Sequence, residues 1–155
     1  MKYSELFQFE AIEPPTPTEE SLASVAASRL VKKSPEQRER VRAYLSGFTH
    51  CYQGMAERLD EFVALFPIHP DYFPVVRQVH SAAPADVLAG LSVVLRALLD
   101  TEVPADRLAL IGYDSYWEQL CQAPTNRGNS DLRAVMDSGR EIEKRLSEIV
   151  REPEA

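Results

Sequence analysis

PADVLAGLSVVLRALL, residues 84–99, is the stretch that decides the fold class. Pro84 suits the first turn of a helix, where its missing N–H costs no hydrogen bond. Apolar side chains then recur around much of the helix circumference, as in a helix with neighbours on several sides. Gly90, Ser92 and Arg96 interrupt the run, which is too short to span a bilayer. The stretch therefore predicts the central helix of a helical domain.

Helix signals continue on both sides of this stretch. The clearest is Ser34-Pro35-Glu36-Gln37, in which Ser34 caps, Pro35 takes the first helical position and Gln37 completes a capping box. This helix is expected to end at Gly47. Further helices are predicted at 18–31 with Thr18 as the cap, at 55–66, at 72–79, from Pro104 to about Gly112, after Asp114, and from Ser130 onward.

These signals predict an all-α fold, an irregular bundle of about six or seven helices with an extended N-terminal tail. Residues 19–152 are expected to form a single helical domain. The aromatic side chains of Phe66, Tyr72 and Trp117 should lie in its core. The apolar stripe of the last helix repeats about every seven residues, a pattern suited to packing on a neighbouring helix.

Residues 1–18 form a separate compositional unit. An apolar tip with Tyr3, Leu6, Phe7 and Phe9 precedes a proline-rich spacer at 14–18, which cannot be helical and favours an extended chain. The tip is predicted to bind a protein partner. The alternative is that its apolar side chains dock onto the core of their own domain.

The charge pattern disfavours nucleic acid as a partner. The formal net charge of −7 repels phosphates at long range. A nucleic-acid-binding helical module is nevertheless the second hypothesis, with contacts from Arg38, Arg40, Arg42 and Arg127. The interleaved Glu36 and Glu39 make the first three more typical of a solvated helix face.

Two cysteines and the absence of a signal peptide or membrane segment predict a cytoplasmic protein with free thiols. The sequence has no glycine-rich phosphate loop followed by Lys and Ser or Thr. Its histidines and cysteines are scattered, whereas a metal site needs several ligands at short spacing. We therefore predict no catalytic residue, no metal and no cofactor. A hydrolase that uses Cys51 or His69 is a third, weaker hypothesis.

Three ordered motifs suggest a relationship to a known family. They are Leu65-Phe66-Pro67-Ile68-His69-Pro70-Asp71-Tyr72, then Val103-Pro104-Ala105-Asp106-Arg107, then Gly112-Tyr113-Asp114-Ser115-Tyr116-Trp117. In combination they resemble the helical region that follows the nucleotide-binding core in large P-loop ATPases of the BREX and phage-growth-limitation type of bacterial antiviral defence. The resemblance extends over about residues 31–150.

The opening residues 2–10 resemble the very start of such ATPases, and the nucleotide-binding core that separates the two regions in the family has no counterpart here. The resemblance therefore implies a helical part without the nucleotide-binding core, and none of the family's catalytic residues has a counterpart position in this sequence. In such ATPases the helical part sits over the nucleotide or against a neighbouring subunit. We accordingly expect a non-catalytic interaction module whose partner is a protein, either a second copy or another defence component.

Overall fold

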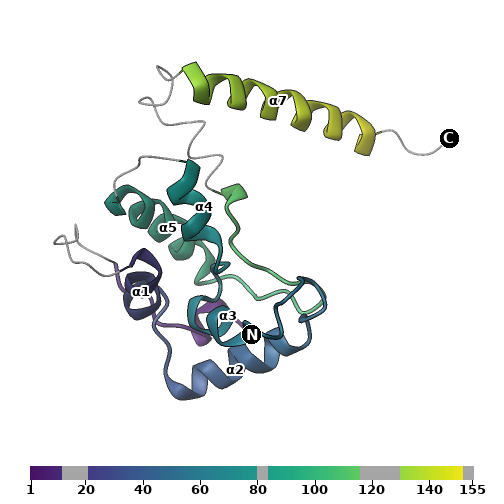
Figure 1. Ribbon diagram of the computed structural model, residues 1–155. Helices are drawn as coiled ribbons and strands as arrows, with labels where there is room; N and C mark the ends of the chain where they lie inside the picture. Colours follow the sequence, from purple (N-terminus) through teal and green to yellow (C-terminus); the bar gives the residue numbers. More distant parts are fainter. Residues whose placement is uncertain (12–20, 80–83, 116–129, 152–155) are drawn as a thin grey trace. The chain divides into compact units, whose positions relative to one another are not determined.

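The computed structural model describes residues 1–11, 21–79, 84–115 and 130–151. The chain divides into two compact units, Met1–Tyr116 and Trp117–Ala155, each of which is described by itself. The first contains helices α1 to α5, and the second contains α7 (Figure 1). Within the described ranges the regular elements are all helical, which confirms the all-α fold. No helix in these ranges is long and apolar enough to cross a membrane.

Helix α2, Pro35–Ser46, begins as the sequence predicts. The Ser34 hydroxyl accepts a hydrogen bond from the Gln37 N–H at 3.2 Å, and the Gln37 side chain accepts one from the Ser34 N–H at 3.0 Å. Two N–H groups that the helix itself leaves unpaired are thereby satisfied. Gly47 follows directly as the C-cap.

Helix α1, Leu22–Val25, starts later than predicted and changes its winding. Ser21 caps it by accepting a hydrogen bond from the Ser24 N–H at 3.2 Å, whereas the predicted cap Thr18 lies outside the described residues. From Ala26 to Leu30 the chain continues as a π-helical segment, η2, which contacts both α3 and α5. The wider winding places Ala26 and Leu30 in the core.

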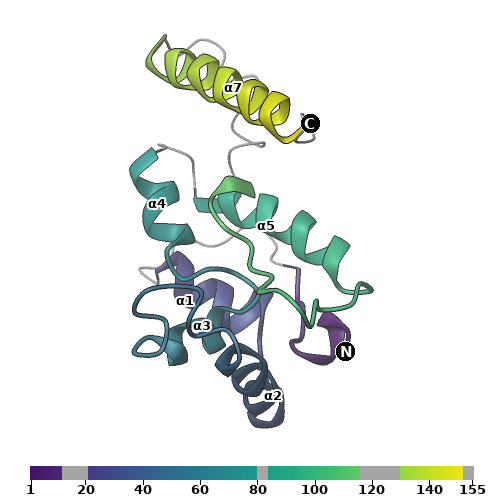
Figure 2. The same ribbon diagram turned by 90° about the vertical axis from the view of Figure 1, so that its right-hand side faces the viewer.

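Helices α3, Leu59–Leu65, α4, Tyr72–Val79, and α5, Pro84–Leu98, complete the first unit (Figure 2). Helix α3 packs against α2 and is shorter than predicted, since residues 53–58 form turns. Phe66 and Tyr72 are fully buried, as predicted, whereas Trp117 lies outside the described residues. Helix α5 buries Val87, Leu88, Leu91 and Leu95, whereas Val93 is 72% exposed, so its apolar residues are not buried all around the helix.

The predicted helix from Pro104 to Gly112 does not form. Here the chain is irregular and bends at residues 105–107. Ile111 then pairs with the segment after α3: its N–H donates to the Pro67 carbonyl at 2.7 Å, and its carbonyl accepts from the His69 N–H at 3.0 Å. Ile111 and Val103 are buried. Tertiary backbone pairing therefore overrides the local helix signal of a proline followed by an acidic residue.

The N-terminal residues belong to the core of the first unit. Tyr3, Leu6 and Phe7 are at most 4% exposed, while Phe9 is half-buried with the Arg96 guanidinium 5.7 Å from its ring centre. This placement corrects the expectation of a partner-binding tip on a separate tail. The physical reason is that the apolar tip finds a groove on its own domain, which was the alternative.

Backbone hydrogen bonds hold this segment on two sides. The Tyr3 N–H donates to the Thr101 carbonyl at 3.2 Å, and the Val103 N–H donates to the Met1 carbonyl at 2.9 Å. On the other side the Gln8 N–H donates to the Lys32 carbonyl at 2.7 Å. A short 3₁₀ turn, η1, at Tyr3–Glu5 lies between these pairings.

Lys33 is buried beneath the N-terminal segment at 8% exposure. Its Nζ donates to the carbonyls of Val31 at 2.9 Å and Ala64 at 3.0 Å, and it lies 6.0 Å from the Phe7 ring centre. Burial, reinforced by the nearby charge of Arg38, lowers the pKa of this amine to about 7. A neutral amine has two N–H groups, which match the two carbonyls.

Leu6→Ala is expected to lower the free energy of unfolding by about 2–5 kcal/mol, the usual cost of truncating a buried leucine. Chemical denaturation measures this change. Ser4→Ala, at an exposed neighbouring position, is the matched control and should change stability by less than about 0.5 kcal/mol. An unfolding midpoint that Leu6→Ala leaves unchanged would contradict a structural role for the segment.

Lys33 should also make stability depend on pH. Its pKa is about 7 in the folded chain and has its ordinary value of 10.5 in the unfolded chain, so between these values the unfolded chain binds the extra proton. The free energy of unfolding should therefore rise with pH across this window. Lys33→Met should flatten the rise, whereas Lys32→Met, at an exposed position, should not. Equal pH slopes for all three proteins in denaturation experiments would refute this assignment.

Candidate functional site

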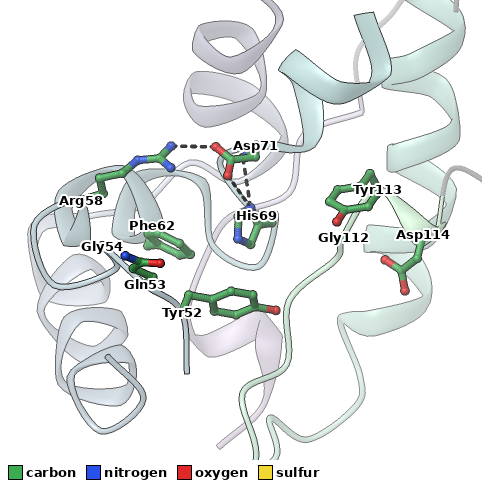
Figure 3. A pocket seen from close by; sticks show the side chains of 10 residues that line it. All are labelled: Tyr52, Gln53, Gly54, Arg58, Phe62, His69, Asp71, Gly112, Tyr113 and Asp114. Carbon is green, nitrogen blue, oxygen red and sulfur yellow. Dashed lines mark hydrogen bonds and ion pairs between the residues drawn. The ribbon is translucent and has the colours of Figure 1, made fainter. Parts of the chain in front are cut away.

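A pocket of about 400 Å³ opens on the first unit (Figure 3). Its walls come from the turns before α3, from α3 itself, from the segment between α3 and α4, and from the segment after Ile111. The residues that line it are Tyr52, Gln53, Gly54, Arg58, Phe62, His69, Asp71, Gly112, Tyr113 and Asp114.

Gly54 shapes the wall that carries Tyr52. Its φ of 76° lies in the left-handed region, which residues with a Cβ adopt only with strain. The chain can therefore turn sharply between Tyr52 and α3. Tyr52 remains about half exposed at the pocket while its ring approaches Phe62, with 6.5 Å between the ring centres.

Arg58, the residue just before α3, joins two carboxylates. Its guanidinium donates to Glu61 at 2.8 Å and to Asp71 at 2.9 Å. The hydrogen bond from Arg58 lowers the pKa of the Asp71 carboxyl, and the two carboxylates raise the pKa of Arg58. The positive charge of this arginine is thus already matched by its neighbours.

His69 has a defined orientation at the back of the pocket. Its Nδ1 accepts a hydrogen bond from the Asp71 N–H at 3.1 Å, so the neutral ring carries its proton on Nε2. The ring meets Tyr52 and Phe62 edge-on, at 5.1 Å between centres in each case. Burial lowers the pKa of His69, and the charge of Arg58 lowers it further, against the opposing effect of Asp71. The imidazole is therefore mainly neutral near pH 7.

Tyr113 and Asp114 form the opposite wall, and Figure 3 shows Tyr113 across the pocket from Tyr52. A Cβ at Gly112 would lie only 2.4 Å from an Asp114 carboxylate oxygen. The carboxylate folds back over the backbone at this point because Gly112 has no side chain. Tyr113 is 55% exposed.

The pocket unites two of the motifs on which the family resemblance rests. His69 and Asp71 come from the first, and Gly112, Tyr113 and Asp114 come from the third. Sequence reasoning did not identify the pocket, and it placed His69 only in a weak hydrolase hypothesis. Both motifs combine polar and aromatic residues, and this shared composition is the sequence feature that could have indicated the pocket. Their proximity depends on the backbone pairing of His69 with Ile111.

Among the described residues, the pocket lining contains the His69 imidazole, two tyrosine hydroxyls and the carboxylates of Asp71 and Asp114, and no thiol or serine hydroxyl. The thiol of Cys51 is exposed and lies 3.8 Å from the Nε2 of the adjacent His50, while Cys121 lies outside the described residues. In the described ranges no three His, Cys, Asp or Glu side chains gather closely enough to hold a metal ion.

Two of the predicted nucleic-acid contacts, both on α2, form ion pairs. Arg40 pairs with Glu36 at 2.7 Å, and Arg42 pairs with Asp60 and approaches Glu39. Their charges are thus partly compensated, as the alternation of charges along the helix suggested. Arg38 is exposed on the same helix, and Arg127 lies outside the described residues.

Helix α7, Ser130–Arg151, presents an apolar stripe in the second unit. Val135, Ile142, Leu146 and Ile149 follow at intervals of seven, four and three residues, which places them on one helix face. All four are between 55% and 68% exposed, whereas Met136 is buried. Ion pairs such as Arg145–Glu141, at 3.0 Å, lie among the remaining polar positions. The stripe is a candidate contact surface.

Comparison with known proteins yields one match. A family model described as the DUF6079 second domain matches residues 34–155. No curated protein and no solved structure shows significant similarity.

Substitutions around His69 should change its pKa in opposite directions. Arg58→Gln removes a cation that lowers this pKa and releases Asp71, so the pKa should rise. Asp71→Asn removes the anion that raises it, so the pKa should fall. The imidazole Cε1–H resonance followed against pH measures both changes. Arg40→Gln alters an arginine outside the pocket and is the control; a change of equal size there would contradict the local origin of these shifts.

Proposed function

We propose that this chain, which belongs to the DUF6079 second-domain family, is a non-catalytic helical module that binds a protein partner through the apolar stripe of α7. The observation that carries the proposal is the exposure of Val135, Ile142, Leu146 and Ile149 on one face of a single helix. Contiguous apolar surface of this kind is typical of an interaction site.

The energetics favour a helical partner. Burial of a large aliphatic side chain contributes roughly 1.5–3 kcal/mol before ordering costs, so four such side chains suffice for a stable contact. Their three-and-four spacing matches the seam along which two helices pack. Charged residues at the other positions keep the opposite face of α7 in water, and they disfavour burial of the whole helix.

The family relationship supports a partner next to this region in longer proteins. The description of the family as a second domain fits a module that works beside another domain. The motifs at 65–72, 103–107 and 112–117 resemble the helical region after the nucleotide-binding core of BREX-type defence ATPases. We infer that the stripe contacts such a core or a second copy of the same chain.

Catalysis is not part of the proposed role. The sequence has no glycine-rich loop with Lys to bind a nucleotide phosphate, and the pocket lining offers no activated nucleophile. Nucleic-acid binding by the arginines of α2 is the alternative, but Glu36 and Asp60 pair with two of them. A contact through α7 should tolerate salt, whereas a phosphate contact should weaken steeply with it.

The test is a double substitution on the stripe, Ile142→Glu with Leu146→Glu. Titration calorimetry against the nucleotide-binding core of a longer family member, together with sedimentation of the chain alone, measures hetero- and self-association. Two buried charges should weaken the contact by at least about a hundredfold, because burial of unpaired carboxylates costs several kcal/mol.

Arg140→Glu with Ser147→Glu adds two carboxylates on the opposite face of α7 and is the matched control. It should leave the affinity within about threefold of the wild-type value, as surface changes usually do. Wild-type protein that neither self-associates nor binds the core would refute the proposal. DNA binding that weakens with salt and persists in the stripe variant would favour the alternative.

A further inference from the structure

The pocket on the first unit has aromatic walls that remain accessible. Tyr52 and Tyr113 are 46% and 55% exposed, and they flank a space backed by Phe62 and the His69 ring. Figure 3 shows these rings on separate parts of the chain around one opening. Faces of aromatic rings carry partial negative charge and attract cations.

The charged groups of the pocket leave an excess of negative charge. Among the described lining residues, Arg58 is the only permanent cation, and it already pairs with Glu61 and Asp71. Asp114 lies on the opposite wall, and no cationic group of the described residues lies within ion-pair distance of it. His69 adds no charge when its imidazole is neutral. An anionic ligand would therefore be repelled.

We propose that this pocket binds an organic cation, a guanidinium or ammonium group, between Tyr52 and Tyr113 with Asp114 as its counter-ion. The volume of about 400 Å³ admits a side chain of the size of arginine or lysine. The cation belongs either to a partner polypeptide or to a small amine, and both offer the same chemistry. The proposal concerns the first unit and stands independently of the α7 contact.

Nuclear magnetic resonance of the full chain tests the proposal with small probes. Nα-acetylarginine methylamide and tetramethylammonium should give saturable shifts at the rings of Tyr52, His69 and Tyr113. The neutral citrulline analogue of the arginine probe has nearly the same shape and should bind much more weakly. Wild-type protein in which the citrulline analogue binds equally well would overturn the proposal, as would the absence of saturable shifts at the three rings.

Two variants locate the cation. Asp114→Asn and Tyr113→Leu should each weaken binding of the arginine probe by about two- to fivefold, the usual effect of one exposed cation contact. Both positions are exposed, and unchanged circular dichroism establishes that the variants fold. Asp86→Asn removes an exposed carboxylate on α5, away from the pocket lining, and should have no effect. Equal affinities in all three variants would refute the site.

A further comparison identifies the source of the cation. A short peptide with one central arginine is titrated alongside the free arginine probe. Tighter binding of the peptide supports a partner side chain as the ligand, and equal affinities support a small amine. Failure of the Ile142→Glu, Leu146→Glu variant to bind its protein partner, with the probe still bound, would separate this pocket from the α7 contact.

Discussion

The pairing of Ile111 with the backbone on either side of Ile68 is the interaction on which the candidate pocket depends. Two hydrogen bonds, from Ile111 to the Pro67 carbonyl and from His69 to the Ile111 carbonyl, join segments more than forty residues apart. They fix His69 and Asp71 on one side and Gly112 to Asp114 on the other. Ile68 and Ile111 are buried, so the packing of the core fixes the positions of the two pocket walls.

The same core explains why the N-terminal segment is structural. Phe7 covers Lys33, and Tyr3 stacks on Phe66 with 6.0 Å between the ring centres. Phe66 in turn meets Tyr44 of α2 edge-on. The aromatic rings thus link the first residues to α2 and to the segment that leads into the pocket. Removal of one ring exposes its neighbours, since a packed interior has few spare contacts.

Short-range sequence patterns predicted helices such as α2 and α5, whereas contacts between residues far apart in the chain could not be predicted. The capping box at Ser34–Gln37 and the apolar periodicity of 84–99 act within a few residues, so the sequence alone was sufficient for α2 and α5. The non-helical segment at 101–111 and the burial of Tyr3 and Leu6 depend on partners far along the chain. The same tripeptide, Pro-Ala-Asp, occurs at 84–86 and at 104–106. The second copy lies between the backbone pairings of Val103 with Met1 and of Ile111 with the segment around Ile68. The pocket could not be predicted for the same reason, because residues 52–71 form one side of it and residues 112–114, about forty residues further along the chain, form the other.

The backbone pairings of residues 1–10 with residues 32 and 101–103 determine the order in which these contacts can form as the chain is synthesised. Gln8 pairs with Lys32, a nearby residue that leaves the ribosome soon after it, whereas Tyr3 pairs with Thr101 and Met1 with Val103. The second set must wait until about a hundred residues have emerged, and it then closes a loop of nearly that length. Such closure is entropically costly and slows folding. The apolar tip therefore stays exposed until residues 101–103 have been synthesised, and during that interval it can make non-native hydrophobic contacts.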